Sequence, residues 1–114
     1  MEKRIYASVL LSFYGPLLTE RQLQILRYYY EEDLSLSEIA ELLGMTRQAA
    51  HDAIRRGESQ LARLEEKLNL HARWAHMCEQ LMIAKAHLSS GDTDQAEETI
   101  RNLLEEEQAD AFIH

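Results

Sequence analysis

The segment from Leu34 to Arg56, LSLSEIAELLGMTRQAAHDAIRR, restricts the fold more than any other part of this 114-residue chain. It places a small residue, Ala40, four positions before Gly44, with apolar residues at helical spacing on both sides. A helix-turn-helix needs this combination, because a small residue lets two helices cross closely and glycine accepts the positive φ of the turn. The segment therefore predicts a helix-turn-helix, and these residues would lock its two helices: Ile39, Ala40, Leu43, Gly44, Met45, Ala50 and Ile54.

The ends of the two helices are also indicated by the sequence. Ser35-x-x-Glu38 fits a capping box, in which each side chain satisfies an unpaired backbone donor of the first turn. Thr46 is suited to cap the second helix, which we expect to run from Arg47 to roughly Leu68.

The second helix carries the side chains expected to contact nucleic acid. Arginine can donate two hydrogen bonds to guanine, glutamine can bind adenine, and a helix N-terminus suits a phosphate. An alternative interpretation is that Arg55 and Arg56 pair with Asp52 at helical spacing and only solvate the surface. The predicted contact residues are Thr46, Arg47, Gln48, His51, Arg55 and Arg56.

The net charge of −8 is unevenly distributed along the chain. Residues 1–74 contain ten Lys or Arg and eleven Asp or Glu, whereas residues 75–114 contain two and nine. The acidity therefore belongs to the last third of the chain and does not exclude nucleic-acid binding by the helix-turn-helix. Basic groups on the second helix are nevertheless few, although phosphate contacts dominate the affinity of such proteins.

The rest of the chain shows helical periodicity and no strand pattern, so we expect an all-α fold. A first helix over about residues 3–14 would bury Ile5, Val9, Leu10 and Phe13. Thr19-x-x-Gln22 fits a second capping box, and a last helix would begin near a capping Asp94. The run Tyr28-Tyr29-Tyr30 could stack on bases, but three consecutive helical residues point in different directions, which favours a core role.

Apolar residues recur at steps of four and three from Leu70 to Leu88, which is a heptad-like pattern. Two interpretations remain open: the last helix of the same chain covers this seam, or the seam pairs two copies or binds a partner. The seam residues are Leu70, Trp74, Met77, Leu81, Ala84 and Leu88.

The sequence predicts neither an enzyme nor a cofactor. His71, His76, Cys78 and His87 lack the spacing of metal ligands, no phosphate-binding loop is present, and no nucleophile has a credible base. No apolar run approaches the roughly 20 residues of a membrane span. A single cysteine agrees with a reducing compartment, so we expect a cytoplasmic protein.

Three stretches closely resemble the YlxM family of small bacterial helix-turn-helix proteins: SFYGPLLTERQ, YYYEEDLSLSEIAELLGMTRQAAHDAIRR and ESQLARLEEKLNL. The resemblance covers about residues 5–71. It implies a fold like region four of sigma factors, the part that binds promoters. It also implies an accessory or regulatory role in the signal recognition particle pathway, with a DNA-binding module.

We therefore expect one all-α domain over residues 1–114, with a helix-turn-helix core at about 17–70 and a C-terminal helical extension at about 71–114. The expected function is regulation in that pathway through binding of DNA or of the particle's RNA. The alternative is a non-catalytic interaction module whose acidic C-terminal helices dock a protein of the particle. No membrane partner is expected, and a homodimer would be a further outcome of the heptad-like seam.

Overall fold

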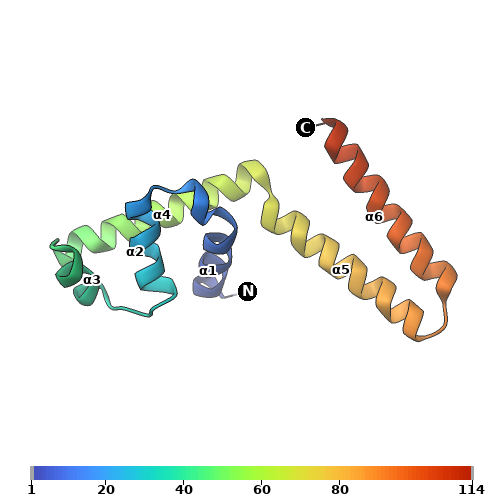
Figure 1. Cartoon of the computed structure of the whole chain (residues 1–114), viewed down its shortest axis with the longest axis horizontal. Helices are drawn as coiled ribbons and strands as arrows, with labels where there is room; N and C mark the ends of the chain where they lie inside the picture. Colours follow the sequence, from blue (N-terminus) through green and yellow to red (C-terminus); the bar gives the residue numbers. More distant parts are fainter. Residues whose placement is uncertain (1, 114) are drawn as a thin grey trace. The chain divides into compact units, whose positions relative to one another are not determined.

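The computed structural model describes the backbone of residues 2–113 and the side chains of residues 2–109. Within these residues the chain is all-α, as expected, and contains no strand. The elements are α1 (Lys3–Tyr14), the 3-10 turn η1 (Gly15–Leu17), α2 (Glu20–Tyr30), α3 (Leu36–Leu43), α4 (Arg47–Leu68), α5 (Leu70–Ser89) and α6 (Thr93–Ile113) (Figure 1). None of the described helices is long and apolar enough to cross a membrane.

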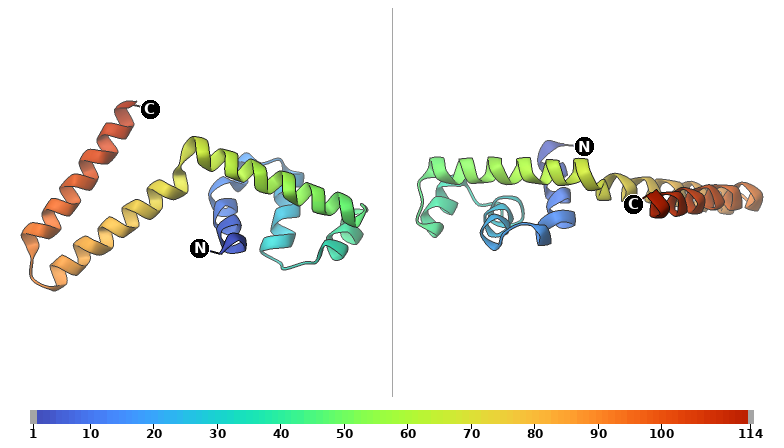
Figure 2. Two further views of the ribbon diagram at one scale, coloured as in Figure 1. Left: turned by 180° about the vertical axis from the view of Figure 1, so that it is seen from behind. Right: turned by 90° about the horizontal axis from the view of Figure 1, so that it is seen from above.

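The chain divides into two compact units, Met1–His71 and Ala72–His114. In the first unit α4 is the common support, because α1, α2 and α3 all pack against it (Figure 2). Its buried residues recur at helical spacing along one side, and they are Ala50, Ile54, Gly57, Leu61 and Glu65.

The crossing of α2 and α4 is unusually close at Gly57. A Cβ atom at this position would lie 2.8 Å from Cδ1 of Leu26, a side chain that is fully buried. Gly57 is therefore needed for the close packing of α2 on α4. From the sequence alone it is only a residue of low helix propensity inside a long helix.

The buried face of α1 differs from the expected one. Leu10 is buried as predicted and Val9 and Phe13 are half-buried, but Ile5 is 52% exposed. The other buried residues of α1 are Leu11 and Tyr14. The helix is rotated from the expected orientation because Tyr14 enters the core beside Glu65, where its hydroxyl finds a buried partner. The periodicity of apolar residues cannot predict this polar contact.

The second unit is a hairpin of α5 and α6 joined by a turn at residues 90–92. Gly91 lies in this turn and has a φ of +83°, which glycine adopts without strain. The cap of α6 is Asp92, whose Oδ1 accepts a hydrogen bond from the Gln95 backbone at 3.1 Å, and not the predicted Asp94. The helix starts one residue earlier than expected, at Thr93.

The structure divides the heptad-like seam of α5 into two rows. Ala84 is buried and Met77 is half-buried on the side where α5 meets α6. The other seam members remain substantially exposed: Leu70 at 39%, Trp74 at 53%, Leu81 at 50% and Leu88 at 54%. The last helix therefore covers only part of the seam.

Candidate nucleic-acid interface

The turn between α3 and α4 has the geometry that a helix-turn-helix requires. Gly44 ends α3 in the left-handed conformation, with φ +66° and ψ +38°. The Met45 amide donates back to the carbonyl of Ala40 at 2.9 Å, which satisfies one of the last carbonyls of α3. The lock residues Ile39, Ala40, Ala50 and Ile54 are buried, and Leu43 and Met45 are half-buried against them.

Both helices of the motif begin with side-chain caps. The Ser35 hydroxyl accepts from the Glu38 amide and the Glu38 carboxylate accepts from the Ser35 amide, which is the predicted capping box. These hydrogen bonds lower the pKa of Glu38. Thr46 accepts from the Ala49 amide at 3.0 Å, so α4 starts at a fixed point on the surface.

The structure separates the predicted contact residues of α4 into two groups. Gln48 donates to Oδ1 of Asp52 at 3.0 Å, and Nδ1 of His51 lies 3.6 Å from the same oxygen. Arg55 and Arg56 are exposed, and neither pairs with Asp52. The structure therefore contradicts the alternative interpretation, in which Asp52 forms ion pairs with these two arginines.

The pairing of arginines differs sharply between α4 and the rest of the molecule. The chain has nine arginines. Four of them lie within 4 Å of a carboxylate, in the pairs Arg4–Asp33, Arg27–Glu31, Arg73–Glu107 and Arg101–Glu97. The other five make no ion pair or hydrogen bond with any described side chain, and they are Arg21, Arg47, Arg55, Arg56 and Arg63.

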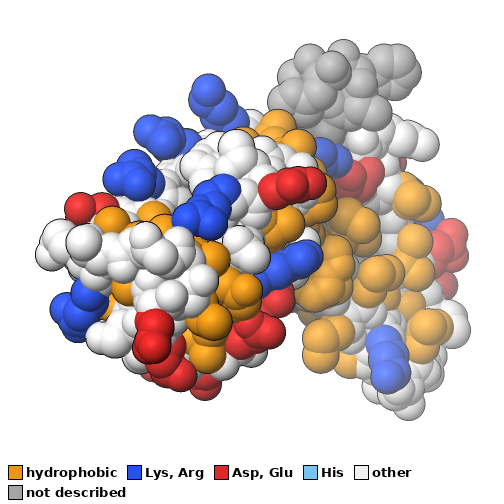
Figure 3. All heavy atoms as spheres, turned by 60° about the vertical axis from the view of Figure 1, so that its left-hand side comes forward, with side chains coloured by type: hydrophobic (Ala, Val, Ile, Leu, Met, Phe, Trp, Pro, Cys, Tyr) orange, Lys and Arg blue, Asp and Glu red, His pale blue; other side chains and the backbone are white. Residues whose placement is uncertain are grey.

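These five side chains, which we call the free-arginine set, lie on α4 and at the start of α2. Two neighbouring grooves bring most of them together. One, of about 470 Å³, is lined by Arg55, Arg56 and Arg63 with Gln22 and other polar residues. The other, of about 220 Å³, is lined by Arg21 and Arg56 among apolar residues of α2 and α4. Basic side chains gather on one side of the first unit in the space-filling view (Figure 3).

The sequence prediction did not include Arg21, Gln22 and Arg63. Arg63 lies two turns beyond Arg56 on the same long helix, so helical spacing alone would have been enough to predict it as a contact residue. Arg21 and Gln22 reach the surface near α4 only through the packing of α2 on α4, which no local pattern of the sequence reveals.

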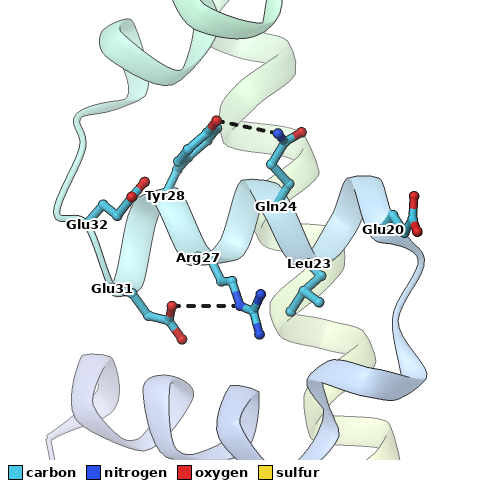
Figure 4. Close-up of a pocket in the computed structure, with 7 residues that line it drawn as sticks. All are labelled: Glu20, Leu23, Gln24, Arg27, Tyr28, Glu31 and Glu32. Carbon is cyan, nitrogen blue, oxygen red and sulfur yellow. Dashed lines mark hydrogen bonds and ion pairs between the residues drawn. The ribbon is translucent and has the colours of Figure 1, made fainter.

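A further depression on α2 has a different character. It has a volume of about 400 Å³ and is lined by the residues labelled in Figure 4: Glu20, Leu23, Gln24, Arg27, Tyr28, Glu31 and Glu32. Nε of Arg27 lies 3.7 Å from the Glu31 carboxylate. Its only cation is thus already paired, and three of its lining residues are acidic, so this side of α2 is unsuited to a phosphate.

The three tyrosines of α2 lie at the edge of the first unit's hydrophobic core. All three are half-buried and pack against the core. The Arg4 guanidinium lies 4.6 Å from the centre of the Tyr29 ring and 5.3 Å from that of Tyr30. Burial and a hydrogen bond with Glu58 raise the pKa of Tyr30. These contacts favour the core role over base stacking.

No group of three His, Cys, Asp or Glu side chains among the described residues is arranged to hold a metal ion. The surface of α4 instead presents exposed cationic side chains on a helix whose first turn is capped by Thr46.

Comparison with known proteins agrees with this geometry. Residues 1–108 match the UPF0122 family, described as "Putative helix-turn-helix protein, YlxM / p13 like". A UPF0122 protein of Clostridium acetobutylicum is 57% identical over 70 residues, which is 61% of this chain and 60% of the relative. One from Symbiobacterium thermophilum is 46% identical over 88 residues, which is 73% of this chain and 82% of that protein. The match to the clostridial relative thus spans less than two thirds of its length.

Proposed function

This chain belongs to the UPF0122 family of YlxM- and p13-like helix-turn-helix proteins, and from that premise we propose that it binds duplex nucleic acid through α4. The proposed target is DNA, with the RNA of the signal recognition particle as the second duplex to be tested. The observation that carries the proposal is the segregation of unpaired arginines. Every arginine of the free-arginine set lies on α4 or at the start of α2, while the arginines of α1, α5, α6 and the end of α2 are paired with carboxylates.

The physical reason for this inference is the free-energy cost of breaking an ion pair that already exists. An arginine that already binds a carboxylate loses that partner when it turns to a phosphate, whereas an exposed, unpaired arginine gives up only water and counterions. Arg47, Arg55, Arg56 and Arg63 are all exposed on the helix that a helix-turn-helix inserts into the major groove. In this proposal Arg47 and Arg55 reach base edges or the nearest phosphates, and Arg56 and Arg63 follow the flanking backbone.

Gln48 and His51 have a more limited part in the proposal. Both already contact Asp52, so either one must leave this carboxylate before it can contact a base. Thr46 is engaged as the cap of α4, but its hydroxyl hydrogen can still be donated to a phosphate oxygen.

The test is a binding titration with matched variants. Arg47→Ala with Arg55→Ala should abolish binding to duplex DNA and to the particle's RNA, measured by fluorescence anisotropy. Arg101→Ala is the control, because it removes one positive charge from an arginine that already pairs with Glu97 at 3.0 Å on α6. Equal losses in both proteins, or wild-type affinity in the double variant, would contradict the proposal.

A second candidate function uses the acidic part of the chain. Helix α6 contains seven Asp or Glu and one Arg. We propose that, if nucleic acid is not the target, this helix docks a basic surface of the particle's protein. Deletion of the residues after Ser90 should then abolish a pulldown of that protein, while the variant lacking Arg47 and Arg55 should retain it.

A further inference from the structure

Helix α5 presents two rows of side chains on adjacent sides. One row meets α6 and is buried or half-buried; it consists of Arg73, Met77, Gln80, Ala84 and His87. The second row is offset by about 75° around the helix, from the 100° turn per residue of an α-helix. It contains Trp74, Leu81 and Leu88, which are each about half exposed, at 53%, 50% and 54%.

Helix α6 repeats this arrangement. Its row facing α5 contains the buried Ala96 and Leu103, with half-buried Thr99 and Glu107. Ile100 and Leu104 lie about 75° away in the same rotational sense and are 38% and 57% exposed. Because α5 and α6 run in opposite directions, equal offsets in the same sense place both exposed rows on the same side of the hairpin. We call this surface the apolar hairpin face: Trp74, Leu81, Leu88, Ile100 and Leu104.

The opposite side of the hairpin checks this geometry independently. His76 and Glu106 are offset by about 60° in the other sense on their respective helices. They should then meet on the back of the hairpin, and Nε2 of His76 does lie 2.8 Å from Oε2 of Glu106. The back of the hairpin therefore carries the His76–Glu106 pair beside the exposed Ile83, whereas the larger group of exposed apolar side chains lies on the other side. Hydrophobic side chains gather along the hairpin in the space-filling view (Figure 3).

The hairpin has little core of its own. Among the described residues of the second unit, the buried hydrophobic side chains are Ala84, Ala96 and Leu103, of which two are alanines. A unit of about 40 residues with so small a core usually needs a disulfide, a metal or oligomerisation for stability. Two adjacent seams per helix are the arrangement of a four-helix bundle, in which each helix contacts two neighbours.

We propose that the apolar hairpin face binds the same face of a second copy of this chain, so that two hairpins form an antiparallel four-helix bundle. Charge favours a specific arrangement of the two copies. Helix α5 carries two Lys or Arg and one Asp or Glu, whereas α6 carries one and seven. Packing α5 of each copy over α6 of the other brings opposite charges together, while α6 over α6 would oppose two sets of carboxylates.

The available area is sufficient for such a dimer. Eighteen residues of α5 extend about 27 Å, and two helices side by side are about 20 Å wide, so the face covers about 500 Å² in each copy. Pairing two copies buries about 1,000 Å² in total, which is at the lower limit of the size of a specific interface. Apolar centres and charged edges are also what distinguish a lasting interface from a chance contact.

Sedimentation velocity of the full chain tests the proposal. Wild type should sediment with twice the 13.2 kDa mass of one chain, and Leu81→Glu should sediment as a monomer. Met82→Glu is the matched control, because Met82 is the next residue of α5 and is 71% exposed, but lies about 100° away from Leu81. The control should remain a dimer.

Two measurements keep the result interpretable. Leu104→Glu places the same charge on α6, and circular dichroism reports whether each variant keeps its helices. Trp74 is the only tryptophan, so its emission should shift to longer wavelength when wild type is diluted into monomers. A wild-type monomer at high concentration, a dimer that survives Leu81→Glu and Leu104→Glu, or equal dissociation by Met82→Glu would each overturn the proposal. Those outcomes would instead favour another occupant, such as the first unit of the same chain or a protein of the signal recognition particle.

Discussion

The hydroxyl of Tyr14 donates a hydrogen bond to Oε1 of Glu65 at 2.5 Å, in the interior of the first unit and 51 residues apart in sequence. Tyr14 is fully buried, and only 8% of Glu65 is exposed. The same hydroxyl accepts from the Leu70 amide at 3.1 Å, and Glu65 accepts from the His71 amide at 3.0 Å. These bonds fix the end of α4 and the first residues of α5 to α1.

Replacement of Tyr14 by phenylalanine removes this donor and leaves a buried carboxylate with one fewer partner. We expect the free energy of unfolding to fall by about 1–3 kcal/mol, the cost of an unsatisfied buried polar group, as measured by urea unfolding. Tyr6→Phe is the control, because no described side chain bonds to the Tyr6 hydroxyl, and it should change stability by less than about 0.5 kcal/mol. Equal effects of the two substitutions would show that the Tyr14 bond contributes nothing specific.

The same site predicts a loss of stability in alkali. Burial and the hydrogen bond with Glu65 raise the pKa of Tyr14 above its ordinary value of 10.0. The folded protein therefore holds this proton more tightly than the unfolded chain, so the contribution is complete below pH 10 and is lost as the pH rises further. Unfolding free energy should fall more steeply above pH 10 in wild type than in Tyr14→Phe. Parallel curves of unfolding free energy against pH for the two proteins would contradict the raised pKa of Tyr14.

Gly57 tests the packing of α2 on α4. An alanine in the middle of a helix is ordinarily favoured over glycine by about 1 kcal/mol. Here the added Cβ would lie 2.8 Å from a buried methyl group of Leu26, and overpacking of this kind costs about 1–3 kcal/mol. We expect Gly57→Ala to be destabilising by about 1 kcal/mol net in thermal or urea unfolding. A stabilised variant would show that the crossing adjusts freely.

The sequence predicted the parts of the fold that local rules determine. Gly44 in its left-handed turn, the capping boxes at Thr19 and Ser35, and the bounds of α4 all depend on residues within a few positions of one another. The side of α1 that is buried depends on Tyr14 meeting Glu65, which are far apart in sequence, and periodicity selected Ile5 instead.

The residues of the candidate interface also fall into those that the local sequence predicts and those that depend on contacts between distant segments. Arg47, Arg55 and Arg56 could be selected because they follow the turn on one helix, and Arg63 could have been found by extending that helix. Arg21 could not, because only the packing of α2 on α4 brings it to the groove with Arg56. The pairing of Asp52 with Gln48 and not with the arginines depends on rotamers that helical spacing leaves open.

Asp52 opposes the proposed binding, since it is the one carboxylate in residues 46–56 and it engages Gln48 and His51. Asp52→Ala should therefore raise the affinity for duplex DNA by roughly fivefold, because a pair of unit charges a few ångströms apart in water is worth about 1 kcal/mol. Glu79→Ala, which removes an exposed carboxylate from α5, is the control in the same anisotropy assay. A weaker complex with Asp52→Ala would show that Asp52 contributes to recognition directly.

The central claim is that the free-arginine set binds phosphates, and the salt dependence of wild-type affinity tests it most directly. Each phosphate neutralised on duplex DNA contributes about −0.9 to the slope of log K against log salt, so engagement of most of this set predicts a slope near −4. An affinity that does not change with salt, or no measurable binding at low salt, would contradict the claim.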